Sequence, residues 1–247
     1  MGTILGDTLS DAGFTNLDVI ALIVFFVSWK LHFWIVHQSP WRHKTISAKM
    51  SLFRQRWMNG MVYRDLKMPD AMIQNTLQYG VLFFASTSIL LIGALLAGFG
   101  ASDQAIKVLG DLPFTVKTTR TVWEVKVLML ALIFTFAFFK FTWSYRLLNY
   151  VIIMIGAAPD LSVAAAKGVE DRVDPENYSD RVAQLHTLGA RHFTTGLNAY
   201  FFALAACAWF LSPVLFIIAT IWVSLVLYRR AFWSTFGRIL NGIDGLD

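Results

Sequence analysis

Two basic side chains, Lys140 and Arg146, lie within the apolar stretch FAFFKFTWSYRLLNY at residues 136–150. A charged side chain inside a bilayer is costly and marks a candidate functional site. Counted at 1.5 Å per residue from the outer ends of their helices, Lys30 and Lys140 would lie at depths of about 18 and 20 Å. Arg146 and Asn149, three residues apart, share a helix face at the cytoplasmic interface. These four residues form our candidate site for an anion or a lipid headgroup.

Two interpretations of these charges are open. In the first, Lys30 and Lys140 extend toward the cytoplasmic headgroups, and Arg146 binds a lipid phosphate or a loop carboxylate. In the second, the same side chains face a central polar cavity that holds an anion or a lipid headgroup. Because arginine offers a planar fork of donors, which lysine lacks, we expect Arg146 to form a structural clamp.

The sequence contains no recognisable catalytic or metal-binding motif. The histidines at 32 and 37, and those at 186 and 192, are spaced so that neither pair shares a helix face. Nucleophile-elbow, phosphate-loop and zinc-protease motifs are absent, and a single cysteine excludes an intrachain disulfide. The basic residues lie beside a predicted span, where the membrane surface explains them better than a nucleic acid does. We therefore expect no enzymatic activity, metal, cofactor or nucleic-acid partner.

The elements that would position these residues are transmembrane helices. Of the 247 residues, 56% are hydrophobic and 15% are charged, whereas soluble domains carry about 25% charged residues. Four stretches are long and apolar enough to cross a bilayer, at residues 17–36, 77–99, 122–158 and 197–228. The last two exceed the hydrocarbon thickness of about 30 Å, so we expect them to extend into the cytoplasm. The sequence thus predicts an all-α membrane protein of four transmembrane helices, with residues 1–247 forming a single membrane domain.

The charge distribution predicts the orientation of these helices. The loop after the first span is rich in lysine and arginine, whereas the N-terminal tail carries Asp7 and Asp11 and no basic residue. By the positive-inside rule the loop is cytoplasmic and the N-terminus is outside, and four spans then place the C-terminus outside as well. The basic segment YRRAFWSTFGR after the last span argues against that position of the C-terminus. We expect a multi-pass protein of the bacterial inner (plasma) membrane.

The basic loop itself contains an amphipathic helix. In ISAKMSLFRQRWMNGM, residues 46–61, apolar side chains that include Trp57 recur every three or four positions. Lys49, Arg54 and Arg56 lie largely off that stripe. This pattern is typical of a helix that lies on anionic lipids or packs on the bundle, and docking of a partner is the alternative.

The second span carries a face of small residues. Ser86, Gly93 and Ala97 lie close to one stripe, and Gly93 and Ala97 form a small-xxx-small pair. Such faces let membrane helices approach closely. The face would serve either packing within the chain or the seam of a homo-oligomer.

Three blocks of the sequence resemble a known family. They are QYGVLFFASTSILLIG, FKFTWSYRLLNYVIIMIGAAP and GLNAYFFALAACAWFLSPVLFIIATIWVSLVLYRRAF. In this order they are similar to domain of unknown function 599, a group of bacterial and plant integral membrane proteins, over about Trp29 to Phe232. The resemblance implies a multi-span membrane protein and no particular activity. One departure is Ala231, at a position where an acidic residue is expected.

Together these observations predict a protein that acts through interaction. We expect a homo-oligomer, or an accessory or scaffold subunit of a membrane complex, in contact with anionic lipids. An anion channel or transporter with a basic intramembrane site is the alternative, and its substrate is not readable from the sequence.

Overall fold

The computed structural model describes residues 13–40, 43, 45–110, 116, 118–160, 174–233 and 239. Within these ranges the secondary structure is helical and contains no strand. Much of the predicted N-terminal tail, the third loop at 161–173 and most of the sequence after residue 233 lie outside them.

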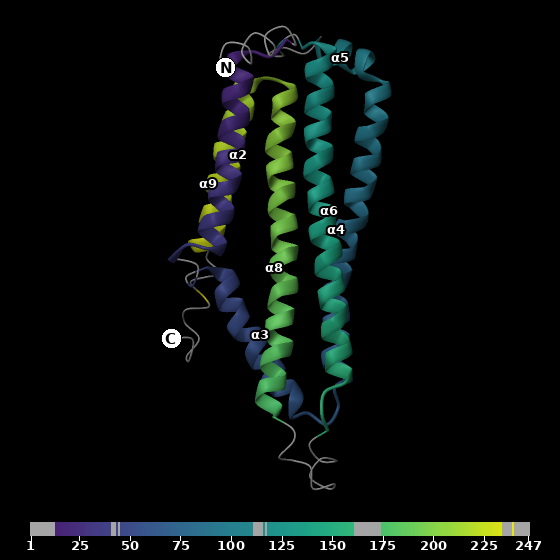
Figure 1. Ribbon diagram of the computed structural model, residues 1–247, viewed down its shortest axis with the longest axis vertical. Helices are drawn as coiled ribbons and strands as arrows, with labels where there is room; N and C mark the ends of the chain where they lie inside the picture. Colours follow the sequence, from purple (N-terminus) through teal and green to yellow (C-terminus); the bar gives the residue numbers. More distant parts are fainter. Residues whose placement is uncertain are drawn as a thin grey trace, which may run out of the picture. The chain divides into compact units, whose positions relative to one another are not determined.

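Among the described residues, five helices are long and apolar enough to cross a membrane (Figure 1). They are α2 (Asn16–His37), α4 (Met68–Gly100), α6 (Arg120–Gly156), α8 (Pro175–Cys207) and α9 (Pro213–Phe232). Two others are the amphipathic α3 (Ile46–Val62) and the short α5 (Ser102–Gly110). The prediction of an all-helical, multi-span chain is therefore confirmed, and three of the four predicted spans correspond to α2, α4 and α6.

The prediction of one helix over residues 197–228 is wrong. The chain forms a short 3₁₀ helix, η3 (Ala208–Phe210), after α8 and then begins α9 at Pro213. Proline has no N–H and clashes with the carbonyl four residues before it, so a helix cannot continue through it without a kink. Ser212 accepts a hydrogen bond from the Leu215 N–H at 3.1 Å, which caps α9 with proline at the first helical position. The prediction that the C-terminus lies outside depended on four crossings, whereas the described residues contain five candidate spans.

Local capping fixes where α2 and α3 begin. Thr15 and Asp18 form a capping box, in which the Thr15 side chain accepts from the Asp18 N–H and Asp18 accepts from the Thr15 N–H at 2.9 Å. Thr45 caps α3 by accepting from the Ala48 N–H at 3.3 Å. These caps satisfy N–H groups that a helix start leaves unpaired.

The helices fall into two length classes. α2 has 22 residues and α9 has 20, which gives about 30 Å and matches a single bilayer crossing. α4 and α8 have 33 residues and α6 has 37, so these helices are about 50–55 Å long. Each long helix therefore carries about 20 Å more than the hydrocarbon layer requires.

The chain divides into two compact units, and each long helix contributes to both. Unit 1 consists of Met1–Arg42, Thr87–Ala137 and Leu197–Ala231. Its interior is aromatic: the Phe25 ring of α2 lies 5.7 Å from Phe202 of α8 and 5.2 Å from Phe216 of α9. Aromatic pairs at this spacing add stability beyond burial of their area.

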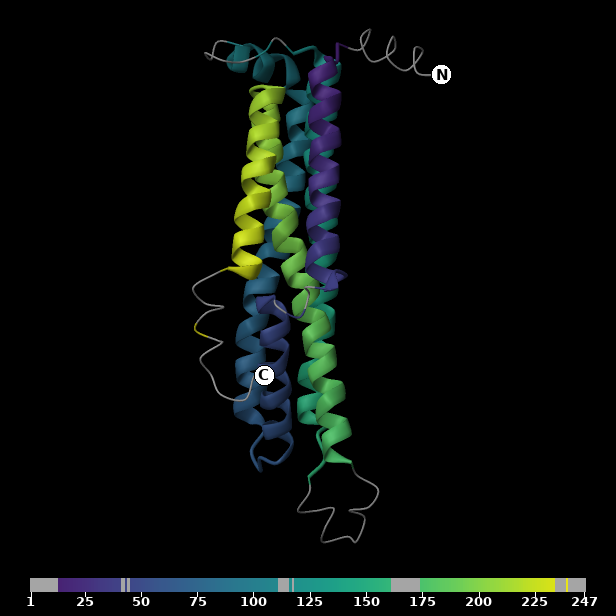
Figure 2. The same cartoon turned by 90° about the vertical axis from the view of Figure 1, so that its left-hand side faces the viewer.

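Unit 2 consists of His43–Ser86, Phe138–Gly196 and Phe232–Asp247. Here α3 turns back along the first half of α4 (Figure 2). Met58, Met61 and Val62 of α3 form a buried core with Val151 and Ile155 of α6 and with Val182 and Ala183 of α8. In the described chain, the apolar side of α3 thus packs on the other helices.

In unit 2, two glycines allow α8 to lie close to α6. A Cβ built on Gly189 would lie 2.8 Å from Leu148, and one on Gly196 would lie 2.6 Å from Phe141. The Ser144 hydroxyl donates to the Gly189 carbonyl at 2.8 Å. The backbone of α8 therefore packs directly against side chains of α6, and any residue larger than glycine at these two positions would clash with them.

Candidate functional site

The four residues of the predicted anion site differ in their surroundings. Lys30 is exposed in unit 1, whereas Lys140 is half-buried in unit 2. Arg146 and Asn149 are exposed on α6, in unit 2. Within unit 2, Arg146 and Asn149 share one stretch of helix, as their spacing predicts.

Arg146 contacts aromatic side chains of its own helix. Its Nε donates to the Tyr150 hydroxyl at 2.7 Å. The guanidinium carbon lies 5.7 Å from the centre of the Trp143 ring and 5.8 Å from that of Tyr150. None of the ion pairs among the described residues includes Arg146. An exposed arginine between a tryptophan and a tyrosine is the arrangement typical of a membrane–water interface.

A buried lysine, Lys126, was not among the predicted residues. Lys126 is 3% exposed in unit 1, and its ammonium lies 5.3 Å from the Trp209 ring centre. The Trp209 Nε1–H donates to Asp18 at 2.7 Å, so one indole contacts an acidic and a basic side chain. Spacing along a single helix does not reveal this group, because its members come from α2, α6 and η3.

The four residues of α3 that were predicted to mark a membrane-surface helix have unequal exposure. Arg56 is exposed, with its guanidinium 5.9 Å from the Phe53 ring centre, while Lys49, Arg54 and Trp57 are half-buried. Burial lowers the pKa of Arg54 from its usual value. Arg54 and Trp57 therefore belong partly to the interior of unit 2.

The small-residue face of α4 is exposed. Ser86, Gly93 and Ala97 are all exposed, and a Cβ built on Gly93 would meet nothing within 4 Å. This differs from Gly189 and Gly196 of α8, where other side chains fill the space. Whether this face packs within the chain or forms the seam of a homo-oligomer therefore stays a prediction, with all three residues exposed in the described chain.

A buried group of polar side chains occupies unit 2, and we call it the polar cluster: Arg54, Trp57, Asp70, Gln74 and His186. Asp70 accepts from the Trp57 Nε1–H at 2.7 Å and is paired with Arg64. The Trp57 ring centre lies 5.6 Å from that of His186. Trp57 therefore links α3 to α4 and to α8.

Most of the polar cluster is deeply buried and incompletely hydrogen-bonded. Gln74 is 0% exposed and neither atom of its amide has a partner, and His186 is 4% exposed with both ring nitrogens unpartnered. One Arg54 Nη and the second Asp70 oxygen are also buried without partners. Spacing gave a signal that the sequence analysis missed: Asp70, Gln74 and Gln78 recur every four residues and form a buried stripe on α4.

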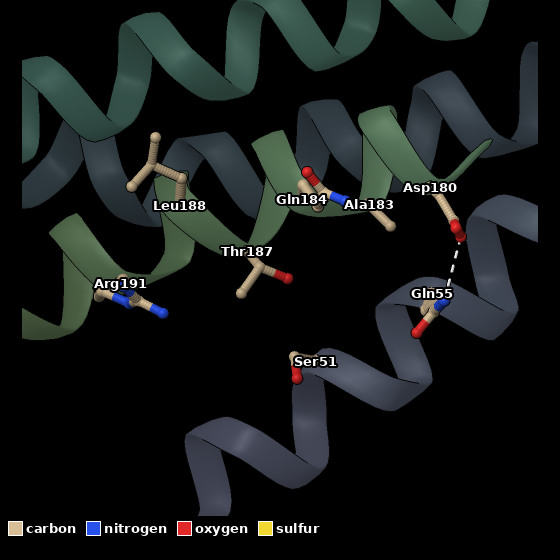
Figure 3. Close-up of a pocket in the computed structure, with 8 residues that line it drawn as sticks. All are labelled: Ser51, Gln55, Asp180, Ala183, Gln184, Thr187, Leu188 and Arg191. Atoms are coloured by element: carbon tan, nitrogen blue, oxygen red, sulfur yellow. Dashed lines mark hydrogen bonds between the residues drawn. The ribbon is translucent and has the colours of Figure 1, made fainter. Parts of the chain in front are cut away.

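A separate open groove of about 440 Å³ lies between α3 and α8 in unit 2 (Figure 3). The Gln55 amide donates to Asp180 at 3.0 Å across it. Ser51, Thr187 and Arg191 also line the groove. Polar and apolar side chains both line this groove, which is open to solvent.

Comparison with known proteins gives one family. The family model described as "Protein of unknown function, DUF599" matches residues 20–236. No curated protein and no solved structure matches the chain.

Proposed function

The chain belongs to the DUF599 family, and we propose that it is a non-enzymatic, multi-pass membrane protein that acts by self-association through α4. The observation that supports this proposal most is the exposed, open face at Ser86, Gly93 and Ala97. Lipid tails are as apolar as leucine, so membrane helices associate where small residues let their backbones approach. A second copy of the same face would supply that neighbour.

The division of α4 into a buried side and an exposed side also supports self-association. One side of the helix is buried in the chain at Gln74, Val81 and Ala85. A different side of the helix exposes the small residues together with large apolar ones such as Leu82 and Leu90. The large side chains provide contact area on both sides of the small-residue seam.

We further propose that all five candidate helices cross the membrane, with the N-terminus outside and the C-terminus in the cytoplasm. Five crossings place the basic loop after α2 and the basic segment after α9 on the same side, which the positive-inside rule favours. On α6, Arg120 and Arg146 are 26 residues apart, or about 39 Å, close to the bilayer thickness with its headgroups. Arg146 would then contact lipid phosphate. The part of α6 that follows Arg146, up to Gly156, would extend into the cytoplasm.

Reporter fusions test this topology. We expect fusions at Gly60 and after Phe232 to lie on the cytoplasmic side and a fusion at Gly110 to lie outside, because an odd number of crossings separates Gly110 from each of the other two. Alkaline phosphatase and fluorescent-protein reporters give opposite signals on the two sides. A reporter after Phe232 that matches the one at Gly110 would rule out five crossings.

Cysteine cross-linking tests self-association. In a Cys207→Ser background, Ala97→Cys is expected to give disulfide-linked dimers in native membranes, because a disulfide requires Cα atoms within about 7 Å. Gly98→Cys is the matched control: it is the next residue on a different side of α4 and also has open space around its Cβ position. Dimer formation is read on a non-reducing gel.

Two outcomes would contradict self-association through the small-residue face of α4. Equal cross-linking at both positions would indicate random collision, and no cross-linking at residue 97 would show that the face does not meet its copy. A further variant, Gly93→Leu, should lower the dimer fraction of Ala97→Cys by about tenfold if the close approach is real. If no dimer forms but a second membrane protein is recovered with the chain, the accessory-subunit alternative takes its place.

A further inference from the structure

The polar cluster of unit 2 contains buried nitrogen and oxygen atoms that have no hydrogen-bond partner within the described chain. A bound polar group would supply these missing partners. Leaving a buried donor or acceptor unsatisfied costs about 1–3 kcal/mol each, and native proteins keep few such groups. Here the unpartnered atoms are on Arg54, Asp70, Gln74 and His186. Several such groups in one unit indicate a polar guest between the helices.

The helix arrangement brings these atoms to the same level. Because α3 and α4 are joined by a short turn and run in opposite directions (Figure 2), a step back along α3 pairs with a step forward along α4. Trp57 bonds Asp70, so Arg54, one turn before Trp57, lies level with Gln74, one turn after Asp70. His186 of α8 reaches the same region through its contact with Trp57.

The charges favour an anion. Asp70 is paired with Arg64, so its negative charge is already compensated. Arg54 is in none of the ion pairs between described residues, and its guanidinium stays protonated even when partly buried. The cluster with Arg64 therefore carries one uncompensated positive charge, and a cation would be repelled.

The hydrogen-bonding groups further favour an anion that carries its own proton. Arg54 and the Gln74 amide nitrogen donate, and a neutral His186 ring both donates and accepts. The Gln74 oxygen and the free Asp70 oxygen can only accept. Sulfate and chloride offer acceptors alone, whereas a protonated phosphate offers both an O–H donor and acceptor oxygens.

From this match we propose that the polar cluster binds a protonated phosphate group. Arg54 and the Gln74 N–H bond its charged oxygens, and Asp70 or the Gln74 oxygen accepts from its P–O–H. The group could be inorganic phosphate or the terminal phosphate of a lipid monoester, since both present the same chemistry. The site is independent of the α4 seam.

Thermal unfolding of the full chain in detergent tests the proposal. At constant ionic strength, inorganic phosphate at saturating concentration is expected to raise the unfolding midpoint by about 5 °C, and sulfate or chloride by far less. Arg54→Gln should abolish the phosphate effect, because it removes the uncompensated charge. Arg56→Gln is the matched control, since Arg56 is exposed on the same helix and should respond like the wild type.

A second variant and a second ligand complete the test. Gln74→Glu is nearly isosteric and adds a repelling charge, so equilibrium dialysis with labelled phosphate should show at least a tenfold loss of affinity. If short-chain phosphatidic acid raises the midpoint and inorganic phosphate does not, the group belongs to a lipid. The proposal is overturned if neither raises it, if sulfate acts as well as phosphate, or if Arg54→Gln retains the effect.

Discussion

Replacing Gly196 by alanine is expected to lower the free energy of unfolding by about 2 kcal/mol. The new Cβ would lie 2.6 Å from the Phe141 ring, which is itself fully buried. Phe141 cannot move freely, because it packs against Phe84 at 5.6 Å and Phe193 at 5.7 Å between ring centres. Overpacking of this kind costs about 1–3 kcal/mol. Chemical unfolding in detergent, followed by tryptophan fluorescence, measures the loss.

The matched control is Gly80→Ala in α4. Gly80 is also a helical glycine of unit 2, but its Cβ position is open. Alanine is the better helix former, so this variant should be as stable as the wild type or gain up to about 1 kcal/mol. Equal losses in both variants would show that the close approach of α8 to Phe141 is not what Gly196 serves.

Replacing Asp70 by alanine is expected to have the larger effect, about 3 kcal/mol in phosphate-free buffer. The change leaves the Trp57 Nε1–H without its acceptor and Arg64 without its partner. Breaking a buried pair by removing one member is strongly destabilising because the other member stays behind. The exposed half of Arg64 moderates the loss. Asp70→Asn retains an acceptor for Trp57 and should lose less.

Asp103 provides the comparison, because its pairing is at the surface. Its carboxylate lies 3.6 Å from Arg120, and both side chains are more than half exposed. Exposed ion pairs add little to stability, so Asp103→Ala should leave the unfolding midpoint unchanged. An Asp70→Ala protein as stable as Asp103→Ala would contradict the structural role given to Asp70.

Helix periodicity and length were sufficient to predict α2, α4 and α6 and the amphipathic α3, because each depends on contiguous residues. The break before Pro213 was also predictable, since serine followed by proline is a helix start. It was missed because the apolar residues continue on both sides of it. The length rule alone therefore merged two helices into one.

The partners across helices could not be predicted in the same way. Trp57 was placed on the apolar stripe of α3, but nothing local indicates that its indole bonds Asp70 and contacts His186. Likewise, Lys30 and Lys140 were predicted as site residues because they interrupt apolar runs, whereas Lys126 is buried in unit 1 and was not predicted. Lys126 lies near the start of its helix, where a sequence leads one to expect a solvated charge.

The bond between Trp209 and Asp18 has a consequence for how the protein is made. The two residues are 191 positions apart, so at 5–20 residues per second the ribosome delivers Trp209 about 10–40 s after Asp18. During that interval one carboxylate oxygen is already held by the Thr15 N–H and hydroxyl. In the described chain the other oxygen, Oδ1 of Asp18, has no partner from its own helix and accepts a hydrogen bond from the Trp209 indole. The bond that joins Asp18 to Trp209 can therefore form only after the chain has been synthesised through η3.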